Sequence, residues 1–396
     1  MHNRFKYLSN IITIFMTNNS LNTFSICLCM IVKNEEKNIH KCLSNLTSFI
    51  NFDHMVICDT GSTDNTINII NEFFTEYSIS GELFHHEWVN FAHNRTLALQ
   101  YAFNKTDYVL IFDADDIIEG NFVLPNALTH HKYSLKFGND FTFYRYCLVN
   151  NRLEWEYIGI LHEYISLKPN QIENVTSSTI NGNYYIKFGT HGCRSQDPFK
   201  YLNDAILLEN AYNDPNLKDD SLRNRYAFYC ANSYYDANIF DQAIKMYNKV
   251  INSNNWNQEK YFSCLQLGNI YMELKNENCA IEYWTKSFTY DNERIETLIL
   301  LMKHFYYKNN HYMVNTFFHK FLNVLLITND FQNINISEKL FCNYSELYMI
   351  HYYNSISAYY TKDYKNGYDS CLYLINNDKF QTLSFDNLQY YIKFIN

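Results

Sequence analysis

The sequence predicts a two-domain chain in which an α/β domain is followed by an all-α domain of helical repeats. Within residues 24–190, short apolar runs alternate with amphipathic stretches, which is typical of strands that alternate with helices. From about residue 204 the strand pattern stops, and small and aromatic residues recur at a fixed helical spacing. We therefore place the α/β domain at 22–203 and the helical domain at 204–396, with residues 1–21 as an N-terminal extension outside both.

The first domain is expected to contain a mostly parallel sheet with helices on both faces, because strands and helices alternate along it. Strands are predicted over three apolar runs, Phe24–Val32, His54–Cys58 and Tyr108–Phe112. Further strands are predicted over Leu83–His86, Phe141–Val149 and Tyr184–Phe188. Helical spacing predicts helices over Asn34–Phe49, Thr66–Tyr77 and Arg95–Phe103.

The second domain carries a four-residue pattern whose members are separated by three, nine and four positions. The pattern occurs at Ala231, Tyr234, Ala243 and Tyr247, at Gly268, Tyr271, Ala280 and Trp284, and at Met302, Phe305, Val314 and Phe318. Ser355, Ala358, Gly367 and Cys371 form a degraded fourth copy. The first units are 37 and then 34 residues apart, close to the tetratricopeptide period of about 34 residues. A generic helical bundle is the alternative.

Composition disfavours several classes of protein. The net charge is −9 and no block of Lys and Arg occurs, which disfavours a nucleic-acid partner. The 11 cysteines never form a C-x-x-C pair, so we expect neither a zinc ribbon nor a disulfide framework, and a reducing compartment fits. The longest N-terminal apolar stretch, Ile11–Met16, is far shorter than the about 20 residues of a membrane span. We expect a cytoplasmic protein, in the host cytoplasm if the chain is viral.

Polar clusters follow three of the predicted strands, at Lys33–Glu36, Asp59–Asp64 and Asp113–Asp116. Open α/β sheets bind ligands at the carboxyl ends of their strands. The first two clusters could also be a helix start and a capped turn. Asp113, Asp115 and Asp116 repel one another unless a cation lies among them, although a solvated acidic turn is an alternative.

Taken in order, these clusters resemble the inverting family 2 glycosyltransferases of the GT-A fold. The resemblance covers Ser25 to Leu208 and rests on CMIVKNEEKNIHKCL, VICDTGSTDNT, WVNFAHNRTLAL, YVLIFDADD and WEYIGILHEY. The similarity is greatest to a branch in which such a domain precedes tetratricopeptide repeats. THGCRSQDPFKYLNDAILLE resembles the junction between the two domains in that branch.

This resemblance implies a metal-dependent transferase that moves a sugar from a nucleotide-diphosphate donor, expected to be a UDP-sugar, to a protein or glycan acceptor. It also implies homodimerisation through the repeats. Mn²⁺ or Mg²⁺ suits hard oxygen ligands, and Asp115 is the best candidate. The expected metal ligands are Asp113, Asp115 and His191. The expected donor-binding residues are Glu35, Asp59, Ser62, Arg95, Asp113 and Lys200. The family usually has Arg-Asn where this chain has Arg95-Thr96, which weakens any role for position 96 but not for Arg95.

Inverting transfer needs a general base near the acceptor. The usual Glu-Asp motif of the family is absent, and Leu161-His162-Glu163 stands in its place. Glu163 is the candidate base and Asp116 a second catalytic candidate, although Glu163 could equally be an exposed strand carboxylate. Trp155 and Tyr157 either stack against sugars or belong to the core.

Two competing functions are considered. One is a protein-interaction scaffold whose repeats bind a partner and whose transferase domain is inactive; it would not bind UDP with Mn²⁺. The other is nucleotidyl transfer, which is disfavoured because no glycine-rich phosphate loop follows the first strand.

Overall fold

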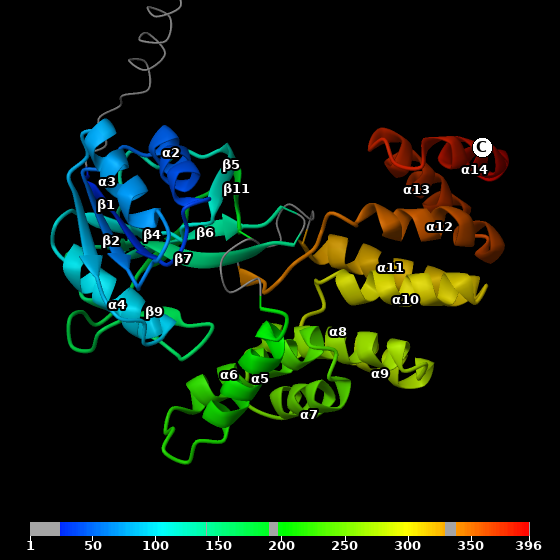
Figure 1. Cartoon of the computed structure of the whole chain (residues 1–396). Helices are drawn as coiled ribbons and strands as arrows, with labels where there is room; N and C mark the ends of the chain where they lie inside the picture. Colours follow the sequence, from blue (N-terminus) through cyan, green and yellow to red (C-terminus); the bar gives the residue numbers. More distant parts are fainter. Residues whose placement is uncertain (1–23, 140, 190–196, 329–337, 396) are drawn as a thin grey trace, which may run out of the picture. The chain divides into compact units, whose positions relative to one another are not determined.

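The computed structural model describes residues 24–139, 141–189, 197–328 and 338–395 (Figure 1). The predicted extension at 1–21 and the candidate ligand His191 lie outside these ranges. The chain divides into two compact units. One comprises the residues up to Gly138 together with Tyr144–Lys200, and the other comprises Asn139–Phe143 together with Tyr201–Asn396.

In the described part of the chain, the first unit holds a nine-stranded mixed sheet. Its strand order is β3 (Gly81–His85), β2 (His54–Asp59), β1 (Ile26–Val32), β4 (Tyr108–Ile111), β7 (Phe143–Asn150), β6 (Lys132–Phe137), β11 (Asn183–Lys187) and β5 (Ile117–Asn121), with β10 (Ser177–Thr179) beside β6. The first four strands are parallel, whereas β7 runs antiparallel to β4 and β5 antiparallel to β11. The sheet is therefore mixed: β1 to β4 form a parallel half, as predicted, and in the other half β6 pairs parallel with β10 and β11 while β5 and β7 supply antiparallel pairs.

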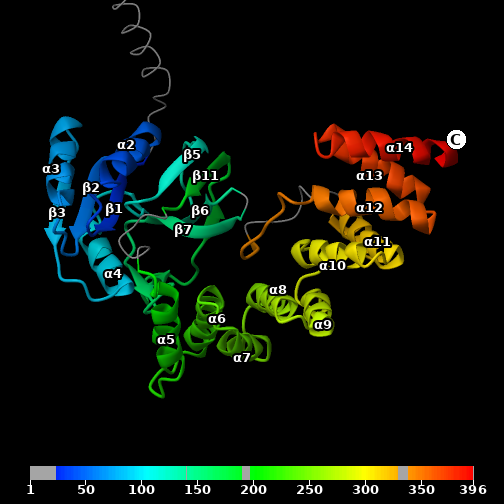
Figure 2. The same ribbon diagram turned by 45° about the vertical axis from the view of Figure 1, so that its right-hand side comes forward.

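Both faces of the parallel half are covered, which explains why its strands are continuous apolar runs. Alternate side chains of β1, Cys27 and Cys29, form one core with α4 (Phe91–Ala102) and with the two-stranded sheet of β8 (Trp155–Ile158) and β9 (Tyr164–Leu167). The intervening β1 side chains, such as Leu28, are equally buried on the other face. There α2 (Ile39–Phe49) and α3 (Thr66–Glu76) lie side by side (Figures 1 and 2).

Two helix starts differ from the prediction for local reasons. The α2 helix begins at Ile39 rather than at residue 34, because Asn34 has a left-handed backbone with φ of 55° and the next residues form a turn. The α4 helix begins four residues earlier than predicted, at Phe91. The side chain of Asn90 caps it by accepting a hydrogen bond from the His93 N–H at 2.8 Å.

The second unit is helical (Figure 2). After α5 (Lys200–Tyr212), which begins at the end of the first unit, its helices are α6 (Asp220–Asp236), α7 (Phe240–Ile251), α8 (Asn257–Glu273), α9 (Glu277–Ser287), α10 (Glu296–Tyr307), α11 (His311–Thr328), α12 (Tyr348–Thr361), α13 (Tyr364–Asn376) and α14 (Gln381–Ile395). No helix in the described ranges combines the length and the apolarity that crossing a bilayer requires.

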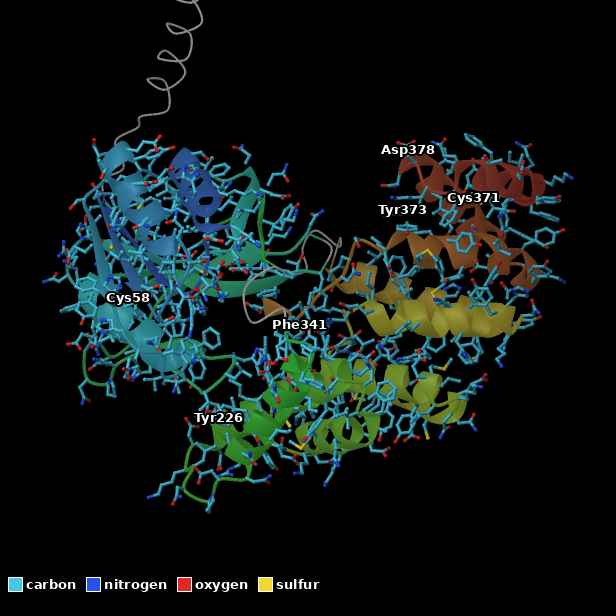
Figure 3. The ribbon with its side chains drawn as sticks, viewed as in Figure 1. Cys58, Tyr226, Phe341, Cys371, Tyr373 and Asp378 are labelled. Atoms are coloured by element: carbon cyan, nitrogen blue, oxygen red, sulfur yellow. The ribbon has the colours of Figure 1, made fainter. Side chains whose placement is uncertain are left out.

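The predicted four-residue pattern falls on successive helix pairs. Its copies lie on α6 and α7, on α8 and α9, on α10 and α11, and on α12 and α13, the last of which carries Cys371 (Figure 3). The small residues allow close packing between helices: a Cβ atom at Gly268 would lie 2.3 Å from the Trp284 ring. A helical second domain is therefore confirmed, whereas its identity as tetratricopeptide repeats stays a prediction.

A buried arginine holds the segment before α12 in place. The Arg294 side chain is 0% exposed and donates to Glu296 Oε1 at 2.7 Å and to the carbonyl oxygens of Leu340 and Phe341 at 2.7 and 2.9 Å. Phe341, labelled in Figure 3, stacks on Phe141 within the same unit. The segment before α12 is thus held by hydrogen bonds from the buried Arg294 and by the stacking of Phe341 on Phe141.

Candidate active site

The three predicted aspartates directly follow β4, and the first of them lies between two arginines. Arg95 Nη2 is 2.7 Å from Asp113 Oδ1. Arg145 donates through both Nη1 and Nη2 to Asp113 Oδ2, each at 3.1 Å. The same Arg145 lies 3.9 Å from Asp116 Oδ2. Both oxygens of Asp113 are therefore engaged by guanidinium groups.

The two arginines come from different parts of the first unit. Arg95 lies on α4, and its side chain is 9% exposed. Arg145 lies on β7, whose antiparallel register with β4 pairs Leu110 with Leu148. Extending this register by three residues brings position 113 opposite position 145. Sequence reasoning missed Arg145, although a single cation inside the aromatic and apolar run FYRYCLVN was an available signal.

Burial and neighbouring charges shift the pKa values of the three aspartates in different directions. Burial favours the neutral form of Asp113, but the two arginines outweigh it and hold the pKa of Asp113 well below its usual range. Burial and the Asp113 charge raise the pKa of Asp115. Burial, followed by the Asp113 charge, raises the pKa of Asp116 to about 7, although Arg145 and the Gly189 N–H, 3.1 Å from Asp116 Oδ1, oppose the shift.

Gly189 closes over the aspartates from the segment after β11. Besides donating to Asp116, it approaches Asp115 so closely that a Cβ atom at position 189 would lie 2.3 Å from Asp115 Oδ2. Sequence reasoning missed this glycine, because it is far from the aspartates in sequence and belongs to no motif. The predicted ligand His191 is two residues further along and lies outside the described residues.

Glu163 is brought to the aspartates by the loop that joins β8 and β9. Arg95 Nε donates to Glu163 Oε1 at 2.9 Å, and the Glu163 side chain is 12% exposed. Gly159, with φ of 115°, supplies the left-handed backbone of this turn. One guanidinium therefore connects Asp113 with the predicted base, so Glu163 is a largely enclosed, ion-paired carboxylate rather than an exposed one.

The loops after β1 and β2 are hydrogen-bonded to each other. The Asn34 N–H donates to Ser62 Oγ at 2.9 Å, and the Thr63 N–H donates back to Asn34 Oδ1 at 2.7 Å. The Glu35 N–H donates to Thr66 Oγ1 at 2.7 Å. The predicted donor-binding residues Glu35 and Ser62 thus lie in two loops that are hydrogen-bonded to each other at the carboxyl edge of the sheet.

Asp59 and Glu35 lie at this edge, at the end of β2 and just after β1 respectively. Asp59 is buried at the end of β2, where its carboxylate accepts hydrogen bonds from the N–H groups of Gly61 and Ser62 at 3.0 and 3.1 Å. Burial raises the pKa of Glu35, whose carboxylate accepts from Asn38 Nδ2 at 2.8 Å. Lys200 begins α5 beyond the segment that the structure does not describe.

Asp115 is the aspartate best suited to a divalent cation. Among the described residues, no group of three or more His, Cys, Asp or Glu side chains is arranged to hold a metal ion. Both oxygens of Asp113 face arginines, but neither arginine forms an ion pair with Asp115. A half-buried carboxylate whose charged form is disfavoured by burial and by a like charge fits a hard cation as its partner.

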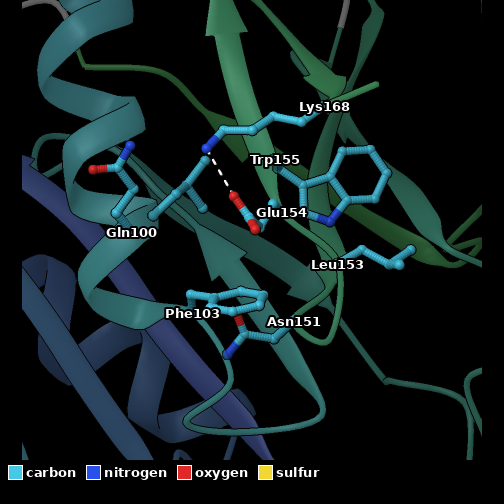
Figure 4. Close-up of a pocket in the computed structure, with 8 residues that line it drawn as sticks. Gln100, Phe103, Asn151, Leu153, Glu154, Trp155 and Lys168 are labelled. Atoms are coloured by element: carbon cyan, nitrogen blue, oxygen red, sulfur yellow. Dashed lines mark hydrogen bonds and ion pairs between the residues drawn. The ribbon is translucent and has the colours of Figure 1, made fainter. Parts of the chain in front are cut away.

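The aromatic residues before Glu163 have structural positions. Trp155 is 4% exposed and belongs to the core beneath the sheet, while the Tyr157 ring lies 5.7 Å from the Arg95 guanidinium carbon. A cavity of about 190 Å³ beside Trp155 is also lined by Phe103 and by the ion pair of Glu154 and Lys168 (Figure 4). Its lining includes Asn151, whose N–H bonds the Asp107 carbonyl before β4 begins, so this cavity lies at the opposite edge of the sheet from the aspartates.

Comparison with known proteins finds limited sequence similarity. A curated relative, the SPbeta prophage-derived glycosyltransferase SunS of Bacillus subtilis (strain 168), is 32% identical over 96 residues, which are 24% of this chain and 21% of the relative. The chain thus aligns with about a fifth of the length of that relative. The same values describe the glycosyltransferase SunS of Bacillus phage SPbeta.

Two solved structures are similar to this chain at low sequence identity. The S. aureus TarS fragment 1–349 in complex with UDP-GlcNAc is 13% identical with a TM-score of 0.31, covering 65% of this chain and 89% of that one. The mannosyltransferase PcManGT of Pyrobaculum calidifontis, in complex with GDP-Man and Mn²⁺, is 11% identical with a TM-score of 0.35, covering 67% and 87%. Residues 27–190, most of which lie within the first unit, match the family model for glycosyl transferase family 2.

Proposed function

We propose that this chain is an inverting, metal-dependent glycosyltransferase that moves a sugar from a nucleotide-diphosphate donor, a UDP-sugar, to a protein or glycan acceptor. The observation that carries the proposal is the position of Arg95. It binds Asp113 at the carboxyl end of β4 and Glu163 in the β8–β9 loop, and so places a donor-side carboxylate and a candidate base in one cluster.

The donor would bind along the carboxyl edge of the parallel strands. The paired loops after β1 and β2 offer Glu35, Asp59 and Ser62 to the nucleoside, and Asp113 and Asp115 face the diphosphate. Asp115 would hold Mn²⁺ or Mg²⁺, with Asp113 and His191 as further proposed ligands and Lys200 as a further diphosphate contact. When bound, the cation supplies positive charge that stabilises the departing diphosphate.

Glu163 acts as the general base in this proposal. The acceptor atom attacks the anomeric carbon while Glu163 takes its proton, and the bond from that carbon to the diphosphate oxygen breaks. The electron pair of that bond leaves with the nucleoside diphosphate. Arg95 fixes one oxygen of Glu163, and Asp116 completes the acidic cluster as the second catalytic candidate.

Paired substitutions test the two assignments. Asp115→Asn should abolish transfer and the Mn²⁺-dependent binding of UDP, measured by calorimetry, because it removes a charged ligand while nearly preserving shape. Asp107→Asn is the matched control, since Asp107 precedes the same strand at its other end, where its carboxylate is bonded to Ser25 and Arg152. If the Asp115→Asn variant still binds UDP in the presence of Mn²⁺, the metal assignment is refuted. If the wild type does not bind UDP with Mn²⁺, the scaffold function is favoured.

The general base is tested in the same way. Glu163→Gln should retain UDP binding but lose turnover, because the amide cannot accept the proton. Glu154→Gln is the matched control, because Glu154 lies before β8 and forms a surface ion pair with Lys168 at 2.8 Å. Normal turnover in Glu163→Gln would move the base to another residue.

We also propose that the helix pairs are tetratricopeptide-like repeats which hold the acceptor or a second copy of this chain. The equal spacing of the four-residue pattern supports this, together with the close packing required at Gly268. The ten cysteines in the described ranges are free thiols. They accord with the cytoplasmic location that we propose.

A further inference from the structure

Arg145 occupies a position in the acidic cluster that differs from that of Arg95. Both of its Nη atoms reach Asp113 Oδ2, and it also lies near Asp116. Its guanidinium carbon stands 4.6 Å from the centre of the Phe137 ring, and 36% of its side chain is exposed. Arg95 is 9% exposed and is held by a second carboxylate, that of Glu163. Arg145 is therefore the more accessible of the two cations.

Among the described residues, the cluster contains more carboxyl groups than cations. Asp113, Asp115, Asp116 and Glu163 supply four carboxyl groups, against two positive charges from the arginines. The field of Arg145 also acts on Asp115, with which it forms no ion pair. A divalent cation at Asp115 would add positive charge to this acidic cluster, and it would at the same time be repelled by Arg145.

We propose, resting on the proposed function, that Arg145 is an internal counter-cation that weakens the binding of a divalent cation at Asp115 while no nucleotide is bound. Arg145 neutralises aspartates that the cation would otherwise attract, and like charges repel across a partly buried cluster. A nucleoside diphosphate brings negative charge to the same place and offsets Arg145. Metal binding should therefore strengthen when nucleotide is present, and Arg145 is the residue that couples the two events.

The coupling is measurable with Mn²⁺ alone and without any turnover. Mn²⁺ binding to the full chain is followed by the electron paramagnetic resonance signal of the free ion, with no nucleotide present. Arg145→Met should bind Mn²⁺ on the order of tenfold more tightly than the wild type, because one repelling charge is gone. Arg145→Lys keeps the charge and should stay within about twofold of the wild type. Arg145→Gln, which can still donate to Asp113, should behave like Arg145→Met even if the methionine variant folds poorly.

The same titrations with UDP present separate this inference from the proposed function. The wild type should bind Mn²⁺ more tightly with UDP than without it, and the difference should shrink in Arg145→Met. Unchanged or weaker Mn²⁺ binding in both neutral variants, while the wild type with UDP binds Mn²⁺ normally, would overturn the role of Arg145 alone. Absence of Mn²⁺ binding to the wild type even with UDP would overturn the proposed function and this inference together.

Discussion

Gly189→Ala should disable the aspartate cluster while leaving the fold intact. A Cβ atom at this position would lie 2.3 Å from Asp115 Oδ2, 2.4 Å from its Cγ and 2.5 Å from its Cβ. Ordinary contact begins at 3.4 Å, so the two residues must separate by 3.4 − 2.3, about 1.1 Å. Because the Asp115 Cβ is itself in conflict, rotating the carboxylate does not relieve the overlap, and one of the two backbone segments must move.

A displacement of about 1 Å in a catalytic group can cost about 100-fold in rate. We therefore expect Gly189→Ala to lower sugar transfer and donor hydrolysis about 100-fold, measured with a radiolabelled nucleotide sugar. Gly182→Ala is the matched control, because its Cβ would lie 3.0 Å from the Tyr184 ring, away from the aspartates. The melting temperature of both variants should stay close to that of the wild type. Transfer by Gly189→Ala within about twofold of the wild type would refute the reasoning.

Two predictions concern the stability of the second unit. Arg294→Met should lower the free energy of unfolding by about 3–5 kcal/mol, measured with urea, because it leaves the largely enclosed Glu296 carboxylate without its ionic partner; a loss below about 1 kcal/mol would contradict this. His351 stacks on Tyr373, and burial lowers the pKa of His351 to about 4 from about 6.5 when unfolded. The unfolded chain then binds the proton more readily, so this unit should lose up to about 3 kcal/mol as the pH falls from about 6.5 to about 4. His351→Phe should remove that part of the pH dependence, and an unchanged slope in urea titrations would show that the acid sensitivity arises elsewhere.

The parts of the fold that sequence predicts are those with a strong local pattern. Buried parallel strands such as Ile26–Val32 read as continuous apolar runs, and the helix pairs repeat one spacing of small and aromatic residues. The strands β5, β6 and β10 and the β8–β9 sheet have no comparable pattern. Ile117–Asn121, for example, contains Gly120 with φ of 95° and is a strand because it pairs antiparallel with β11. Long-range pairing decides such segments, and a single sequence does not display it.

The candidate site also contains residues that sequence motifs predict and residues that they do not. Arg95, Asp113, Asp115 and Glu163 were expected from motifs, and the structure brings Arg95, Asp113 and Glu163 into direct contact. Arg145 contributes through the register of an antiparallel strand, and motif reading does not supply that register. Gly189 likewise matters because its backbone lies close to Asp115, and not because it carries a functional group. No sequence pattern near residue 189 indicates this contact.

The two arginines of the cluster are alike in charge but not in consequence. Removing Arg95 would leave two carboxylates, those of Asp113 and Glu163, without the group that joins them, and both are largely enclosed, with 23% and 12% of their side chains exposed. Removing Arg145 would leave Asp113 still bound to Arg95 through its other oxygen. In our proposal, Arg95 therefore serves the architecture of the site and the placement of Glu163, whereas Arg145 gives up its partners when a metal ion and an anionic nucleotide bind together. A cluster with one fixed and one exchangeable arginine would, on this proposal, admit a metal ion with its nucleotide and still remain assembled without either.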